Sequence, residues 1–114
     1  MYMRIAIPLA KGILAPHFGH CEKFALIDAD PESGKILTKT ETSPPPHEPG
    51  LFPAWLADRG ATHIIAGGLG ERAQGLFAQN GIQVLVGAPD ESPEVIVTSF
   101  LEGSLKSGAN LFDH

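Results

Sequence analysis

Short apolar runs separated by glycine and proline form the hydrophobic pattern of this chain. The runs at Arg4–Pro8, which ends in proline, and Phe24–Asp28 are typical of short apolar strands. Lys35–Thr42 alternates charged and smaller residues, which is typical of an exposed or edge strand. Asp30–Gly34 supplies the proline and glycine of a tight turn, so the second and third strands are predicted to form a hairpin.

From Leu51 onward, apolar residues recur at helical spacing. One predicted helix places Phe52, Trp55, Leu56 and Arg59 at i, i+3, i+4 and i+7, and Gly60 is its C-terminal stop. Thr62–Ala66 is predicted to be a buried strand. A second helix then runs through Asn80, with an apolar face made of Leu69, Ala73, Leu76 and Phe77.

The last part of the chain repeats this alternation. Ile82–Val86 is a further apolar strand, and Ser92-Pro93 is a good cap and first residue for a final helix. The predicted inward positions of that helix are Val97, Phe100, Leu101 and Leu105. The order β-β-β-α-β-α-β-α predicts an α/β fold with a mixed five-stranded sheet and helices on its faces. We expect one domain over residues 1–114, with an irregular tail at 103–114.

Composition narrows the functional classes. Lys and Arg number 8 against 13 Asp and Glu, a formal net charge of −5, which argues against a nucleic-acid partner. No apolar run approaches the roughly 20 residues of a membrane span, so no membrane partner is expected. One cysteine excludes a disulfide framework within the chain and fits a reducing compartment, so we expect a cytoplasmic protein.

The predicted topology gathers four connecting segments at one edge of the sheet. In open α/β sheets, ligands bind at the carboxyl ends of the strands. The connectors predicted to share that edge are residues 9–22, 43–50, 67–71 and 87–91. His63 begins a strand and should lie at the opposite end of the sheet.

The candidate metal ligands are His17, His20, Cys21 and His47. Imidazole and thiolate suit copper, zinc or iron better than magnesium or calcium. The alternative from spacing alone is that the histidines are solvated loop residues and Cys21 is a small buried residue. His47 lies in a proline-stiffened segment and could likewise be an exposed connector residue.

A glycine-rich connector is the candidate for holding an anion. Gly67, Gly68, Leu69 and Gly70 join a strand to a helix, where backbone N–H groups favour negative charge, and Arg72 could add a fixed positive charge. The alternative is an ordinary short turn, because the sequence has neither G-x-x-x-x-G-K-[ST] nor G-x-G-x-x-G. No set of acidic residues suits a pair of magnesium ions and no serine has a nucleophile-elbow context, so we predict no catalytic residues.

Several segments together resemble the dinitrogenase iron–molybdenum cofactor-binding family, which includes nitrogenase-cofactor accessory proteins and the orange protein. The matching segments are Arg4–Pro8, His17–Phe24, Pro44–Gly50, Ile65–Ala73, Gly81–Val84 and Asn110–His114. The resemblance implies a three-layer α/β/α, ribonuclease-H-like domain. It also implies a non-enzymatic carrier or scaffold for an anionic metal–sulfur cluster containing molybdenum with iron or copper. Related tails often end in Cys-Asp-His, whereas this one has Phe112 at the cysteine position.

Under this hypothesis the cluster, or a thiomolybdate, binds beside the glycine-rich connector. Its ligands are His17, His20, Cys21 and His47. One cysteine cannot enclose a cluster, so the cargo brings its own sulfide, relies on histidine and backbone contacts, or bridges two chains. A second hypothesis is an adaptor that binds a partner such as an Mrp/MinD-type ATPase or a cofactor-assembly protein, without metal. A third, a ribonuclease-H-like enzyme using Asp28, has weak support from the acidic positions.

Overall fold

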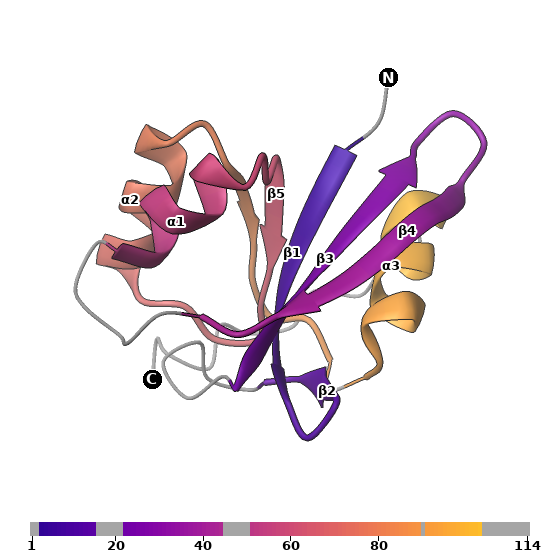
Figure 1. Ribbon diagram of the computed structural model, residues 1–114, viewed down its shortest axis with the longest axis horizontal. Helices are drawn as coiled ribbons and strands as arrows, with labels where there is room; N and C mark the ends of the chain where they lie inside the picture. The colour runs from indigo at the N-terminus through magenta and orange to yellow at the C-terminus, as the bar shows by residue number, and fades with distance from the viewer. Residues whose placement is uncertain (1–2, 16–21, 45–50, 90, 104–114) are drawn as a thin grey trace.

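The computed structural model describes residues 3–15, 22–44, 51–89 and 91–103 of the chain. These residues form a mixed α/β arrangement whose strands and helices alternate in its second half (Figure 1). The elements are β1 (Met3–Ala10), β2 (Ile13–Leu14), β3 (Lys23–Asp30), β4 (Lys35–Thr42), α1 (Leu51–Asp58), β5 (His63–Ile65), α2 (Glu71–Gln79), β6 (Gln83–Leu85) and α3 (Pro93–Glu102).

One mixed sheet organises the fold, in the order β4-β3-β1-β5-β6. β3 is antiparallel to both β1 and β4, whereas β5 is parallel to β1 and β6 is parallel to β5. The predicted hairpin of the second and third long strands is confirmed as β3 and β4. The predicted count of five strands is short by one, because β2 adds a sixth strand that pairs with β1.

The missed strand β2 lies in the segment predicted to be a loop. Lys11 and Gly12 have φ angles of 56° and 82°, and this turn folds Ile13 and Leu14 back onto the end of β1. Two residues are too few to show a hydrophobic period, so the pattern of apolar positions could not reveal them.

Helices cover both faces of the sheet, with α1 and α2 on one side and α3 on the other (Figure 1). Alternate residues of β1 point to opposite faces: Ile5 and Ile7 pack in the α3 layer, and Ala6 packs in the layer of α1 and α2. Because both faces of β1 are buried, the strand reads as one continuous apolar run. This is the three-layer α/β/α, ribonuclease-H-like architecture.

The ends of the helices follow local chemistry. Ser92 caps α3 by accepting a hydrogen bond from the Val95 backbone N–H, and Gly103 ends the helix at a φ of 75°. The inward face of α3 includes Ile96, which the sequence reading missed, and the predicted inward position Leu105 lies outside the described residues. α1 ends at Asp58, so Arg59 is an exposed residue just past the helix.

Candidate functional site

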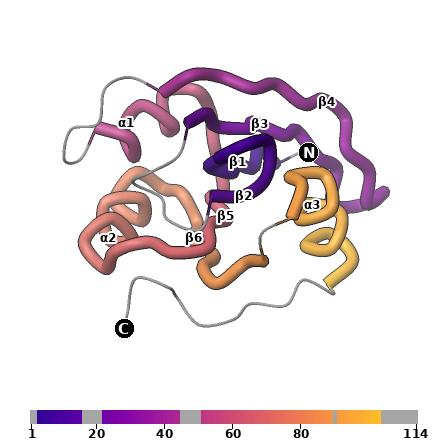
Figure 2. The backbone as a smooth tube through the Cα atoms, turned by 90° about the horizontal axis from the view of Figure 1, so that it is seen from below, coloured from indigo at the N-terminus to yellow at the C-terminus, as the bar shows by residue number. Residues whose placement is uncertain are grey.

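The carboxyl ends of β1, β5 and β6 lie at the same edge of the sheet because these strands run parallel. β3 begins at this edge and β4 ends there, since Phe24 lies opposite Thr42 in their pairing. This edge, which we call the rim, is at the lower end of the sheet in Figure 1 and faces the viewer in Figure 2. The structure therefore confirms that the predicted connectors leave the sheet at one edge.

The described residues on either side of positions 16–21 are fixed to the rim by backbone hydrogen bonds. The Ala15 N–H donates to the Pro8 carbonyl at 2.8 Å, and the Glu22 N–H donates to the Leu9 carbonyl at 2.7 Å. The Glu22 carboxylate in turn accepts a bond from the Lys11 N–H at 2.9 Å. Both flanks of the His17–Cys21 segment are thus anchored to the last residues of β1.

An aromatic cluster holds the start of β3 against the start of α1. The Phe24 ring lies edge-on to the Phe52 ring with centroids 5.6 Å apart, and the Trp55 ring is 5.7 Å from Phe24. Phe24 follows the His17–Cys21 segment closely, and Phe52 follows the segment that contains His47. The packing of these rings therefore fixes the described flanks of both candidate ligand segments at one side of the rim.

The glycine-rich connector between β5 and α2 is tied into the rim. The Gly67 carbonyl accepts a hydrogen bond from the Gly87 N–H at 2.9 Å, which joins the connectors that follow β5 and β6. Leu69 is 1% exposed and its side chain packs with the core, so it can offer a ligand only its backbone. Its carbonyl already accepts a bond from the Gln74 side-chain amide at 2.9 Å.

The first turn of α2 combines several features that favour an anion. Gly70 is its N-terminal cap residue and, having no side chain, makes no side-chain cap bond. With φ −63° and ψ 150°, Gly70 has a conformation open to any residue, so its glycine is not required by backbone geometry. Glu71 and Arg72 follow and are exposed. The Arg72 guanidinium is therefore accessible, and the helix end supplies partial positive charge, while Glu71 opposes it.

The structure does not test the four candidate metal ligands, because His17, His20, Cys21 and His47 lie outside the described residues. His63 is placed as predicted, at the end of the sheet opposite the rim, where it pairs with Ile5. Burial lowers the pKa of His63, and its ring packs on Phe100 with centroids 5.8 Å apart. Within the described parts of the chain, no three His, Cys, Asp or Glu residues are grouped to hold a metal ion.

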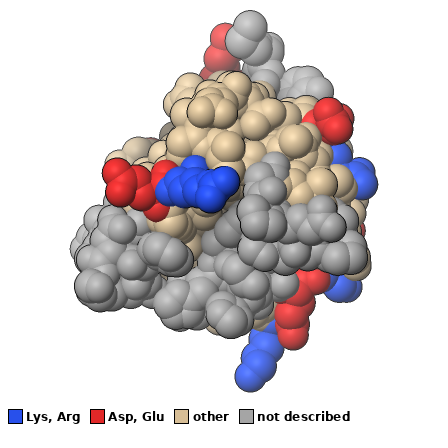
Figure 3. Space-filling view, turned by 90° about the vertical axis from the view of Figure 1, so that its left-hand side faces the viewer, with Lys and Arg blue, Asp and Glu red and all other residues tan. Residues whose placement is uncertain are grey.

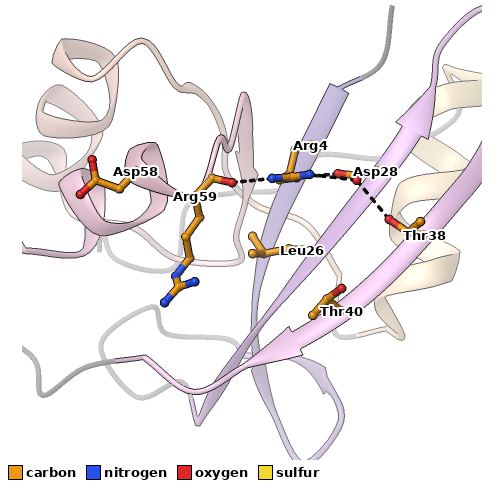
Figure 4. Close-up of a pocket in the computed structure, with 7 residues that line it drawn as sticks. All are labelled: Arg4, Leu26, Asp28, Thr38, Thr40, Asp58 and Arg59. Carbon is orange, nitrogen blue, oxygen red and sulfur yellow. Dashed lines mark hydrogen bonds and ion pairs between the residues drawn. The ribbon is translucent and has the colours of Figure 1, made fainter.

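A second feature, which the sequence reading missed, is an open cleft of about 390 Å³ on the α1 side of the sheet (Figure 4). Arg4 crosses one end of it and donates two hydrogen bonds to Asp28, at 2.6 and 3.0 Å. A third guanidinium nitrogen donates to the Arg59 carbonyl at 2.6 Å. The lining residues are Arg4, Leu26, Asp28, Thr38, Thr40, Asp58 and Arg59.

Asp28 is engaged as an ion-pair partner in this cleft. The Arg4 guanidinium, helped by a bond from the Thr38 hydroxyl, holds the pKa of Asp28 below its ordinary value against a smaller opposing effect of burial. Both carboxylate oxygens accept hydrogen bonds, which leaves Asp28 poorly suited to hold a catalytic magnesium ion. The sequence shows Arg4 and Asp28 as charged residues within apolar strands, but no local pattern pairs them.

Surface charge and helix length add two observations. On the face that Figure 3 shows, acidic and basic side chains of the described residues are interspersed, and neither sign forms a broad field. This pattern differs from the clustered lysine and arginine of a nucleic-acid-binding face. No helix in the described ranges is long and apolar enough to cross a membrane.

Comparison with known proteins identifies the family. The family model described as dinitrogenase iron-molybdenum cofactor matches residues 1–103. This chain belongs to the dinitrogenase iron-molybdenum cofactor family. The uncharacterized protein MJ0580 of Methanocaldococcus jannaschii is similar in sequence to this chain. The two are 36% identical over 109 residues, which span 91% of this chain and 90% of the relative.

Solved structures show the same fold. The crystal structure of PH0822 has a TM-score of 0.85 at 27% identity and covers 95% of this chain and 96% of its own. The apo form of the orange protein from Desulfovibrio gigas has a TM-score of 0.70 at 23% identity, covering 95% of this chain and 94% of its own. At that identity the orange protein supports the fold of this family member and nothing finer.

Proposed function

We propose that this protein is a non-enzymatic carrier or scaffold that binds an anionic metal–sulfur cluster at the rim. Family membership supports a cofactor-related role in general terms. The observation that carries the proposal is the convergence of connectors at the carboxyl edge of the sheet. There the described flanks of both candidate ligand segments lie on the same edge as the glycine-rich start of α2.

The chemistry of the described rim suits an anion that carries its own sulfide. Backbone N–H groups at the start of α2 and the exposed Arg72 side chain favour negative charge. The aromatic and aliphatic residues behind them form a buried core, which holds these connectors in place. A thiomolybdate or a molybdenum–copper or molybdenum–iron sulfide is an anion of this kind.

The ligand set that we propose is His17, His20, Cys21 and His47. Imidazole and thiolate are soft or borderline donors that suit copper and iron. A single cysteine is too few to enclose a cluster, so sulfide supplied by the cargo would complete the coordination. The backbone of Gly67–Gly70 and the Arg72 guanidinium would contact the anionic side of the cargo.

The role of Arg72 is tested by titrating the protein with tetrathiomolybdate and copper and following the visible absorption. Arg72→Gln should weaken binding about fivefold, as expected for the loss of one exposed charge contact worth roughly 1 kcal/mol. The difference should shrink as the salt concentration rises. Arg59→Gln is the matched control, because Arg59 is an exposed arginine at the end of α1 that borders the cleft. Equal weakening by both substitutions would contradict a specific role for Arg72.

Elemental analysis of protein purified from its native source, without added metal, tests the carrier role itself. Molybdenum together with iron or copper, in a fixed ratio to protein, is the expected result. A metal-free protein that retains a specific ATPase partner would contradict the carrier role and favour the adaptor alternative.

A further inference from the structure

β4 is one of the two outer strands of the sheet, and within the described residues its outer edge is unpaired. It stands at one end of the sheet order, and among the described residues it pairs only with β3. Figure 2 shows it running along the outside of the molecule. Along such an edge, every second residue presents its backbone N–H and C=O groups outward, where another strand can pair with them.

β4 carries two of the usual features that discourage pairing at an edge, namely lysines and a bulge, but it lacks two others, short length and proline. It is 8 residues long, and no proline occurs between Lys35 and Ser43. Its one irregularity lies near Leu37, opposite the step from Asp28 to Ala29 in β3. The stretch from Thr38 to Thr42 is regular, and Leu37 itself is 56% exposed, the highest value among the large apolar residues that the structure describes.

The two faces of β4 carry different chemistry. Thr38 and Thr40 line the cleft on the α1 side of the sheet. Lys39 lies on the other side, where its Nζ is 3.2 Å from a carboxylate oxygen of Glu94 on α3 and 3.5 Å from one of Glu41. The strand therefore alternates threonines on one face with a lysine and a glutamate two positions apart on the other.

Within the regular stretch Thr38–Thr42, this alternation is self-complementary in one antiparallel register. A twofold axis through Thr40 places Lys39 opposite the partner's Glu41, and Glu41 opposite the partner's Lys39. Thr38 then lies opposite the partner's Thr42. An axis through Lys39 would oppose two lysines, and an axis midway between Thr40 and Glu41 would pair each charged residue with a threonine.

We propose that β4 is a self-association edge, which pairs antiparallel with β4 of a second copy of this chain about a twofold axis at Thr40. The pairing joins two sheets into one and satisfies the outward backbone groups of both strands. Two cross-strand Lys39–Glu41 pairs fix the register, because opposite charges directly across an antiparallel pair attract.

Sedimentation equilibrium over a wide concentration range, at 0.15 M salt, tests the proposal. The full chain should show a reversible monomer–dimer equilibrium. Lys39→Glu and Glu41→Lys should each weaken it by about tenfold or more, because each replaces two attractive cross-strand pairs with two repulsive ones. When the two variants are mixed, the glutamates of one strand face the lysines of the other, so a heterodimer should form with restored affinity.

Recovery in the mixture shows that both variants are folded and that charge pairing across β4 decides the association. Lys35→Glu is the matched control: it makes the same charge change in β4, but its position lies beyond the paired stretch, so dimerisation should persist. A wild-type chain that remains monomeric at millimolar concentration overturns the proposal. So does a dimer that is indifferent to both charge reversals, or a mixture that does not associate.

Discussion

The Arg4–Asp28 pair offers a quantitative test of how the sheet is tied to α1. Arg4→Met would remove both bonds to Asp28 and the bond to the Arg59 carbonyl while keeping an apolar side chain of similar length. The Arg4 and Asp28 side chains are 30% and 17% exposed, so solvent screens the pair only in part. Hydrogen bonds to charged groups contribute roughly 1.5–3 kcal/mol when shielded and exposed ion pairs less than about 1 kcal/mol. We therefore expect Arg4→Met to lower the free energy of unfolding by about 1–2 kcal/mol.

A double-mutant cycle with Asp28→Asn isolates the pair. Urea denaturation of the wild type, both single variants and the double variant should give a coupling of about 1 kcal/mol at pH 7. Additivity of the two substitutions to within about 0.3 kcal/mol would refute the reasoning, since that is the scatter expected of independent sites. Circular dichroism spectra matching the wild type would show that each variant keeps the fold.

The coupling should depend on pH in a defined direction. Because Arg4 holds the pKa of Asp28 below its ordinary value of 3.8, the native state keeps the carboxylate charged where the unfolded chain takes up a proton. The Arg4–Asp28 pair therefore stabilises the fold fully above the ordinary pKa of Asp28. This stabilisation is lost as the pH falls through the lowered pKa of Asp28 in the folded state. A coupling that grows on acidification would contradict this assignment.

Three further substitutions and one titration test the fold. Phe77→Ala, which empties a fully buried position in the layer of α1 and α2, should lower the free energy of unfolding by about 3–5 kcal/mol in urea denaturation. Gly75→Ala should stabilise the protein by about 0.5–1 kcal/mol, because Gly75 lies inside α2 with open space around an added Cβ. Gly81→Ala should instead destabilise the protein, because Gly81 has a φ of +75°, which side chains other than that of glycine rarely adopt. An NMR titration should place the pKa of His63 below 6.5, because burial disfavours its charged form. Below pH 6.5 the unfolded chain then binds more protons at His63 than the folded protein does. The free energy of unfolding should therefore fall as the pH drops through 6.5 towards the folded-state pKa.

The main architecture was predictable from the sequence because its strands have simple patterns. The sequence of β1 is an apolar run because both faces of the strand are buried. The sequence of β4 alternates charged and smaller residues because much of this strand is exposed to water. The crossover rules for parallel strands then placed the connectors at one edge. β2 was not predictable, because its two residues are set by the turn at Lys11 and Gly12 and by pairing with β1.

The glycine-rich connector could be predicted from the sequence, whereas the cleft could not. The glycine-rich connector and Arg72 stand out by composition and by following a strand. The cleft at the opposite end does not, because Arg4, Asp28 and Arg59 are far apart in sequence and meet only through strand pairing and the end of α1. No local pattern predicts such long-range hydrogen bonds. The roles of His17, His20, Cys21 and His47 stay predictions.

The central claim, that the rim binds an anionic metal–sulfur cargo, is tested most directly by reconstitution with tetrathiomolybdate and copper. The wild type should form a coloured complex of fixed stoichiometry. The variant in which His17, His20, Cys21 and His47 are all replaced by alanine should lose it, whereas Arg4→Met, which alters only the opposite end of the sheet, should bind like the wild type. Unchanged affinity and stoichiometry in the rim variant would contradict the account.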